Sequence, residues 1–300
     1  MRTPFTGVGT ALVTPFRKDG SLDEAAIKRL ARRQIDAGVH FLVPMGTTGE
    51  SPTLSHDEKV RVVALVAEEA NGQVPVMAGA GGNNTREAIE LARDMENVGA
   101  DGFLSVAPYY NKPSQGGLYA HFKAIAESTP RPVMLYNVPG RTGVNIEPAT
   151  VSRLAELPNV IGVKEASANL AQMSEIIAAT PESFLLLSGD DPITVAVMAI
   201  GGRGVISVAS NEAPAEMAQI VELCEKNDFA AARKLHHWLL PLCQVNFVEG
   251  NPIPLKAAMA AMGLLEENYR LPLVPASPAA RAKIMQVLQD LKMLGAAARV

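Results

Sequence analysis

One lysine interrupts an apolar run, VIGVKEAS, at residues 160–167. Val160, Ile161 and Val163 indicate a buried strand, so the amine of Lys164 is expected to lie away from bulk water. Burial favours the neutral form of an amine, and only this form attacks a carbonyl carbon. The pattern therefore predicts a lysine that forms a Schiff base with a carbonyl substrate.

An ordinary ion pair is the alternative role for Lys164, and Glu165 is its obvious partner. Because successive strand residues face opposite ways, we expect Glu165 to point away from Lys164. If the pair forms nonetheless, the protein would be a non-catalytic barrel that binds small carboxylates.

Hydroxyl groups occur near the ends of two other apolar runs. Tyr136, in MLYNVP, could pass protons to and from a Schiff base, although a core tyrosine is the alternative. Thr47 and Thr48, in GTTGES, offer hydroxyls and turn amides that suit a small carboxylate or a proton relay, or they simply form a turn.

Two further motifs place functional side chains on loops. Arg141, in PGRTG, suits bidentate binding of a carboxylate, or is a solvated loop residue. Tyr109 and Tyr110, in PYYNKPS, form an aromatic pair of the kind that marks a subunit contact or a site.

Eight short apolar runs must position these residues. Apolar on both faces, they are typical of parallel strands covered by helices, and they span 10–15, 40–46, 75–81, 102–108, 132–139, 160–165, 184–190 and 204–210. Helical patterns lie between them, two of them after the predicted capping boxes Ser21–Glu24 and Ser55–Glu58, the others at 85–98, 116–128, 147–156, 168–179 and 192–200.

This alternation predicts an α/β fold, a (β/α)8 TIM barrel whose active face lies at the carboxyl ends of the strands. An open doubly wound sheet is the competing arrangement, but GAGG and GGRG lack the spacing of a phosphate loop. Residues 1–210 would form the catalytic barrel. Residues 211–300 are helical only and would form a C-terminal appendage packed on it.

Composition excludes several classes of protein. A net charge of -4, with scattered basic residues, argues against binding to nucleic acid or to a membrane. The N-terminus lacks a signal peptide, and no apolar stretch is long enough to cross a bilayer, so a cytoplasmic location is predicted. Cys224 and Cys243 have no CxxC spacing and are expected to be buried thiols rather than a disulfide or a zinc site, so no metal site is predicted.

GTTGES, PYYNKPS, YNVPGRTG and GVKEAS, in this order, resemble the dihydrodipicolinate synthase family of pyruvate-dependent Schiff-base lyases. The similarity extends from about residue 5 to about residue 273 and includes LSGDD, GVISVAS and FVEGNPIPLKAAM. The resemblance implies a cofactor-free homotetramer of (β/α)8 barrels that condenses pyruvate with L-aspartate 4-semialdehyde in lysine biosynthesis.

The resemblance also implies roles for single residues. Lys164 would bind pyruvate, and Tyr136 would exchange protons through Thr47 with Tyr110 of a neighbouring subunit. Thr48 and the backbone of Ile206, a buried barrel residue by periodicity, would hold the pyruvate carboxylate. Arg141 would bind the carboxylate of the aldehyde substrate.

Many members of the family are inhibited by L-lysine at a subunit interface. The residues that match this possible allosteric site are Ser51, His56, Asn83, Glu87 and Tyr109. Lys59 and Pro52 depart from the feedback-sensitive pattern. Because a cation at Lys59 would repel the effector's ammonium, weak or absent inhibition is the hypothesis.

The alternative within the superfamily is an aldolase that acts on a sugar acid, such as N-acetylneuraminate lyase or a 2-keto-3-deoxy sugar-acid aldolase. A sugar acceptor needs neutral hydrogen-bond partners rather than a fixed cation. Arg141 therefore favours the aldehyde that carries a carboxylate.

Overall fold

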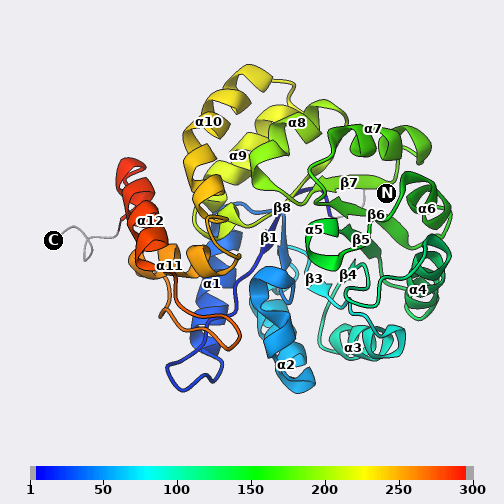
Figure 1. Cartoon of the computed structure of the whole chain (residues 1–300), viewed down its shortest axis with the longest axis horizontal. Coiled ribbons are helices and arrows are strands. Elements are labelled where there is room, and N and C mark those ends of the chain that lie inside the picture. The colour runs from blue at the N-terminus through cyan, green and yellow to red at the C-terminus, as the bar shows by residue number, and fades with distance from the viewer. Residues whose placement is uncertain (1–4, 295–300) are drawn as a thin grey trace.

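The computed structural model describes residues 5–294, in which eight parallel strands curve into a barrel (Figure 1). The strand order is β2-β1-β8-β7-β6-β5-β4-β3, and a parallel bridge between Leu42 and Val76 brings the two ends of the sheet together. The predicted (β/α)8 barrel is therefore confirmed. The strands are β1 (Gly7–Ala11), β2 (Phe41–Val43), β3 (Met77–Gly79), β4 (Gly102–Val106), β5 (Val133–Asn137), β6 (Val160–Glu165), β7 (Leu185–Ser188) and β8 (Gly204–Ser207).

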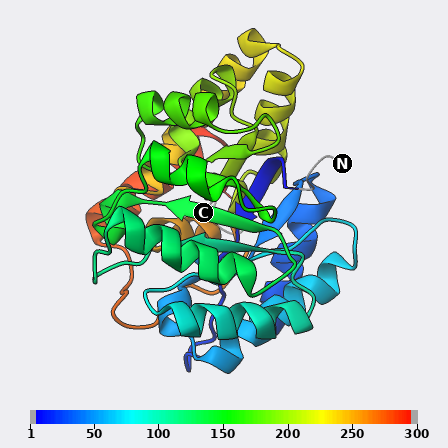
Figure 2. The same ribbon diagram turned by 90° about the vertical axis from the view of Figure 1, so that its right-hand side faces the viewer.

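Helices follow the strands and form the outer layer (Figure 2). They are α1 (Glu24–Asp36), α2 (His56–Ala70), α3 (Thr85–Asn97), α4 (Gln115–Glu127), α5 (Pro139–Thr142), α6 (Pro148–Leu154), α7 (Leu170–Ala179), α8 (Thr194–Ala199) and α9 (Pro214–Glu225). Four short 3-10 turns lie in three of the loops: η1 (Thr47–Gly49) and η2 (Ser51–Thr53) after β2, η3 (Asp191–Ile193) after β7 and η4 (Ala209–Asn211) after β8.

The first strand begins three residues earlier than predicted, at Gly7 rather than Thr10, and ends at Ala11. A Cβ atom at Gly9 would lie 2.1 Å from the ring of Phe41, so only glycine fits beside β2. Glycine has no apolar side chain and does not contribute to a hydrophobic pattern. The start of β1 was therefore predicted three residues too late. By contrast, β6 has the predicted bounds and carries Lys164 near its carboxyl end.

Only one of the two predicted capping boxes forms. Ser55 and Glu58 bond reciprocally at the start of α2, as expected. The prediction for Ser21 is wrong, because Asp23 caps α1 by accepting a 3.0 Å hydrogen bond from the amide of Ala26. Ser21 instead bonds to the side chain of Asp19 in the preceding loop.

Three more helices complete the described chain: α10 (Phe229–Val245), α11 (Ile253–Ala261) and α12 (Pro278–Asp290). Helix α9 contacts β1 and β8, α10 packs on α8 and α9, and α12 packs on α10 and α11. Leu255 and Met259 of α11 share an apolar cluster with Leu30 of α1. The domain boundary after residue 210 stays a prediction.

Side chains fill the inside of the barrel and the layer between strands and helices. The inner cluster includes Val43, Leu104, Tyr136, Leu187 and Ile206, one from each of five strands. Among residues 5–294, no helix has both the length and the apolar character that crossing a bilayer requires.

Candidate active site

A cavity of about 730 Å³ opens at the carboxyl ends of the strands, and we call it the catalytic cavity. Lys164 reaches it from β6 and Tyr136 from β5. Thr47 and Thr48, in the turn after β2, and Arg141 of α5 also line it. The fold thus brings five of the predicted site residues to one end of the barrel.

Lys164 and Tyr136 are paired in the register of β5 and β6 and are both buried. The Nζ atom of Lys164 lies 4.3 Å from the centroid of the Tyr136 ring. Within residues 5–294, this nitrogen makes no ion pair and no hydrogen bond, although the side chain is only 6% exposed. A lysine of this kind is available for reaction with a carbonyl compound.

Glu165 faces the opposite side of β6 and has its own partners. Its carboxylate accepts hydrogen bonds from Asn137 Nδ2 at 2.8 Å, from Gln172 Nε2 at 3.1 Å and from the Ser167 amide at 2.7 Å. The prediction that Glu165 points away from Lys164 is confirmed. The ion pair that a non-catalytic barrel would contain is not formed in the structure.

Glycine at position 189 makes room for the lysine. A Cβ atom there would lie 3.1 Å from Lys164 Cε and 2.6 Å from Ala166 Cβ. Real Cβ atoms are almost never found within 3.0 Å of another atom, so the contact with Ala166 Cβ would force one of the two residues to move. Gly189 directly follows β7, so its missing side chain leaves space for Lys164 at the end of that strand.

Two aspartates follow Gly189. Asp190 lines the catalytic cavity, whereas Asp191 is fully enclosed and accepts 2.9 Å hydrogen bonds from the amides of Val208 and Ala209. Burial raises the pKa of both carboxyls. The bonds of Asp191 fix the turn after β8 against the turn after β7.

The threonine turn after β2 is held by a residue from the C-terminal region. Asn251 Nδ2 donates a 3.0 Å hydrogen bond to Thr48 Oγ1, and Asn251 is itself 6% exposed at the wall of the catalytic cavity. Its Oδ1 atom has no partner among the described residues. Sequence reasoning missed Asn251. The motif FVEGNPIPLKAAM contains it, but nothing in that motif alone links it to residue 48.

A buried ion pair beneath the same turn was also missed. Lys256 Nζ lies 2.6 Å from Glu50 Oε1, and both side chains are 0% exposed. The ammonium also donates a 3.0 Å hydrogen bond to the carbonyl oxygen of Thr14. Helix α11 therefore anchors the chain immediately after Thr47 and Thr48.

Arg141 lines the catalytic cavity and has no acidic partner among residues 5–294. Its only hydrogen bond there is a 3.4 Å bond from a guanidinium nitrogen to the carbonyl oxygen of Asn251. The guanidinium is therefore free to bind a carboxylate that enters the cavity.

Tyr110 and Ile206, the other two residues with a predicted catalytic or substrate-binding role, do not line the catalytic cavity. Tyr110 is 90% exposed in the single chain and has a positive φ of 73°. Ile206 is a buried β8 residue in register with Gly9, and its side chain belongs to the inner cluster of the barrel.

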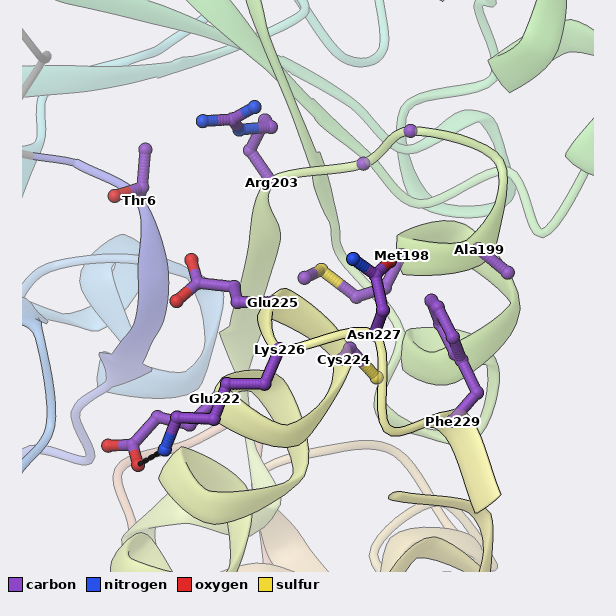
Figure 3. Close-up of a pocket in the computed structure, with 12 residues that line it drawn as sticks. Thr6, Met198, Ala199, Arg203, Glu222, Cys224, Glu225, Lys226, Asn227 and Phe229 are labelled. Atoms are coloured by element: carbon purple, nitrogen blue, oxygen red, sulfur yellow. Dashed lines mark ion pairs between the residues drawn. The ribbon is translucent and has the colours of Figure 1, made fainter. Parts of the chain in front are cut away.

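A second large cavity, of about 620 Å³, lies at the opposite end of the barrel, near the starts of β1 and β8 (Figure 3). Its lysine, Lys226, is paired with Glu222 at 4.0 Å. Burial raises the pKa of the Cys224 thiol there to about 11, so this sulfur is a poor nucleophile at neutral pH. Reactive groups are therefore concentrated at the carboxyl end.

Comparison with known proteins identifies the family. A model of the Dihydrodipicolinate synthetase family matches residues 4–291. The chain belongs to this family. A 4-hydroxy-tetrahydrodipicolinate synthase of Koribacter versatilis is 53% identical over 289 residues, 96% of each protein. A protein of the same name from Chloroherpeton thalassium is 50% identical over 298 residues, 99% of each protein.

Solved structures in the dihydrodipicolinate synthetase family agree with this assignment. A dihydrodipicolinate synthase from Acinetobacter baumannii complexed with pyruvate superposes with a TM-score of 0.95 and 41% identity, over 96% of this chain and 99% of that one. The family and the lyase class predicted from four sequence motifs are therefore confirmed.

The role of the five residues named for the possible allosteric site stays a prediction. Ser51 and Tyr109 line a smaller cavity of about 240 Å³. His56 instead pairs with Asp94 at 2.8 Å, and Glu87 accepts a hydrogen bond from Asn84. The backbone oxygen of Asn83, the fifth match, accepts a hydrogen bond from Asn111.

Across residues 5–294, no three His, Cys, Asp or Glu side chains are placed to hold a metal ion.

Proposed function

We propose that this chain condenses pyruvate with L-aspartate 4-semialdehyde to give 4-hydroxy-tetrahydrodipicolinate. The observation that supports this most directly is the buried amine of Lys164, which lies beside the Tyr136 ring in the catalytic cavity and forms no ion pair with the described residues. The names of the relatives give the same reaction product. Every step described below is part of the proposal.

The first step joins pyruvate to the enzyme. The lone pair of Lys164 Nζ attacks C2 of pyruvate, a C–N bond forms, and the C2 oxygen leaves as water. One proton of that water comes from the amine and the other from solvent. Both are passed on by the Tyr136 hydroxyl, which can donate and accept. The product is a protonated imine on Lys164.

The second step forms the new carbon–carbon bond. The imine loses a methyl proton and becomes an enamine, whose carbon attacks the aldehyde of the second substrate. The aldehyde oxygen takes up a proton and becomes a hydroxyl. The amino group of the second substrate then attacks C2, closes the ring and releases Lys164. No redox agent is needed at any step.

The remaining residues position the substrates. Thr48 and the backbone of Ile206 would hold the pyruvate carboxylate, with Asn251 fixing the Thr48 hydroxyl. Arg141 would bind the carboxylate of the aldehyde in a bidentate manner, since it has no acidic partner of its own among residues 5–294. Thr47 would connect the Tyr136 hydroxyl to Tyr110.

The relay requires more than one chain. Because Tyr110 is 90% exposed and does not line the catalytic cavity of its own chain, we propose that it serves a neighbouring subunit of a homotetramer. A cytoplasmic location remains part of the same proposal.

Borohydride reduction tests the Schiff base directly. Reduction in the presence of pyruvate should add a pyruvate-derived mass to the peptide that contains Lys164, and a Lys164→Arg variant should show no such mass. A wild-type protein without the adduct would exclude the lyase mechanism and leave the non-catalytic barrel.

Substrate choice is a separate question. The guanidinium of Arg141, which forms no ion pair among residues 5–294, favours an acceptor aldehyde that carries a carboxylate. The kcat/KM with L-aspartate 4-semialdehyde should exceed that for cleavage of N-acetylneuraminate or a 2-keto-3-deoxy sugar acid. The reverse order would assign the chain to the sugar-acid aldolases.

A further inference from the structure

Glu212 and Asn246 form a buried polar contact between two segments that border the catalytic cavity. Glu212 ends the η4 turn after β8, Asn246 ends α10, and each side chain is at most 1% exposed. Asn246 Nδ2 lies 2.5 Å from Glu212 Oε2. Val208 lines the catalytic cavity just before the turn, and Phe247 lines it just after Asn246. The contact therefore joins two parts of the cavity wall that are distant in the sequence.

One oxygen atom of each group lacks a partner. Glu212 Oε1 and Asn246 Oδ1 are buried and form no hydrogen bond with residues 5–294. Buried polar atoms in folded proteins are nearly always hydrogen-bonded. Both oxygens are acceptors while the carboxyl is ionised, whereas a protonated carboxyl has an O–H group that can donate to the carboxamide oxygen. Turning the carboxamide over exchanges its nitrogen and oxygen and leaves the same requirement for a proton.

The surroundings of Glu212 disfavour its charged form. Burial is the main cause and raises the pKa of its carboxyl to about 8, and the like charge of Asp191 in η3 acts in the same direction. Arg33 of α1 opposes them, but its guanidinium donates to two main-chain oxygens of the turn, at 2.8 and 2.7 Å, and also faces Glu216 of α9. Burial raises the pKa of the Cys243 thiol on α10, which stays neutral. The carboxyl of Glu212 therefore holds a proton at neutral pH.

We propose that Glu212 and Asn246 form a cyclic pair with two hydrogen bonds, in which a protonated carboxyl donates to the carboxamide and the carboxamide donates back. The pair links the turn after β8 to the end of α10 only while the proton is present. Glu212 is thus a positioning residue for the wall that Val208 and Phe247 contribute to the catalytic cavity. Its effect on pyruvate rests on the proposed function, whereas the protonated pair does not.

Loss of the proton should loosen this wall. An ionised Glu212 loses the second bond of the pair and places another carboxylate near Asp191. Asp191 accepts hydrogen bonds from the amides of Val208 and Ala209, so repulsion between the two carboxylates acts on the same turn. The backbone of Ile206, proposed above to hold the pyruvate carboxylate, lies two residues before Val208. Pyruvate should therefore bind more weakly as Glu212 ionises.

Infrared spectroscopy of the protein without substrate tests the proton directly. The difference spectrum between wild type and Glu212→Gln at pH 6 should contain the band of one protonated carboxyl, and this band should disappear as the pH passes about 8. Glu225→Gln, an exposed change on α9, is the matched control and should leave the band in place. A spectrum without the band at pH 6 would overturn the proposal.

The partner of the carboxyl is tested with Asn246→Leu. This variant removes the carboxamide and keeps an apolar group of similar size, so the carboxyl band should move away from its wild-type position. An unmoved band would show that Glu212 does not bond to Asn246. The same variant replaces Glu212→Gln as the reference if that protein does not fold.

Calorimetric titration with pyruvate tests the positioning role. Glutamine cannot ionise, and its carboxamide can form the same two hydrogen bonds with Asn246. Between pH 6 and pH 9, pyruvate affinity should fall at least about threefold further in wild type than in Glu212→Gln, since about ten carboxylates then exist for each protonated Glu212. Effects of pH on Lys164 are common to both proteins and cancel in this comparison.

The outcomes separate this proposal from the proposed function. Parallel pH curves for wild type and Glu212→Gln would overturn the positioning role. If pyruvate binds neither protein at any pH, the proposed lyase mechanism fails, while the infrared band still decides whether the protonated pair exists.

Discussion

At the scale of single residues, the site depends on one buried lysine that forms no ion pair with the residues the structure describes. Val163 and Glu165 face away from the cavity, so strand alternation gives Lys164 its environment without any special backbone geometry. Tyr136 reaches the cavity for the same reason from the adjacent strand. The chemistry therefore follows from which residues of β5 and β6 point inward.

Gly189→Ala should impair Schiff-base formation. The added methyl group would meet Ala166 and Lys164 Cε, and a displacement of about 1 Å from reactive geometry can cost about 100-fold in rate. The rate of pyruvate adduct formation measures the effect. Gly82→Ala is the control, since nothing lies within 4 Å of its added Cβ. Equal rates in the two variants would contradict the spatial role of Gly189.

Tyr110→Phe should lower kcat by at least about tenfold if its hydroxyl relays protons. The melting temperature should not change, because phenylalanine keeps the ring and removes only the hydroxyl. Steady-state assays and thermal unfolding give the two quantities. Tyr119→Phe is a suitable control, since that ring contacts Arg153 on the outer helices. A fully active Tyr110→Phe enzyme would eliminate the relay.

At the scale of elements, the C-terminal helices take part in building the site. Asn251 bonds to Thr48, and Lys256 of α11 pairs with Glu50 just beyond the threonine turn. Arg270 adds a pair with Glu58 of α2 at 2.6 Å. These contacts connect the region after residue 250 to the loop after β2.

Lys256→Met should destabilise the fold and weaken pyruvate binding. It leaves Glu50 buried without its partner, which costs about 3–5 kcal/mol in the free energy of unfolding. The displaced turn should raise the KM for pyruvate more than it lowers kcat. Urea unfolding and steady-state kinetics measure these quantities. A Glu50→Gln/Lys256→Met double variant should recover part of the stability.

The control for Lys256 is Arg281→Met, which removes a half-exposed partner of Glu267. Exposed pairs contribute about 0–1 kcal/mol, so this variant should unfold close to wild type and keep its KM. If Lys256→Met behaves in the same way, α11 does not position the turn.

Glu212, which precedes α9, should make stability fall as pH rises. Burial raises the pKa of its carboxyl from 4.5 to about 8 in the folded chain. The folded state therefore holds the proton more tightly than the unfolded state, and this stabilisation is lost as pH rises from 4.5 to about 8. Urea unfolding at pH 6 and pH 9 should show a smaller loss for Glu212→Gln than for wild type. Glu225→Gln, an exposed change on α9, should keep the wild-type dependence.

At the scale of the whole molecule, the proposed tetramer makes each active site depend on two chains. Mixing subunits tests this. Lys164→Arg subunits lack the nucleophile, and Tyr110→Phe subunits lack the relay hydroxyl, yet a mixed pair contains one complete site. Co-refolded mixtures should therefore exceed the mean kcat of the two parents, and sedimentation velocity should give a tetramer. A mixture that matches the mean would show that Tyr110 acts within its own chain or not at all.

The amino-acid sequence by itself determined the barrel, the bounds of β6, the inward face of Lys164 and the family. These follow from local periodicity and short motifs, because strand alternation fixes the direction of a side chain within a few residues. The cap of α1 was assigned to the wrong residue. Ser21 and Asp23 are only two positions apart, and both are residue types that cap helices.

Only the tertiary structure decided which distant groups meet. The partners Asn251–Thr48 and Lys256–Glu50 are separated by 203 and 206 residues, and no local pattern pairs them. The same holds for Gly189, whose missing side chain matters only because Lys164 lies beside it. Burial of an ion pair and space for a reactive amine are properties of close packing, which depends on every element at once.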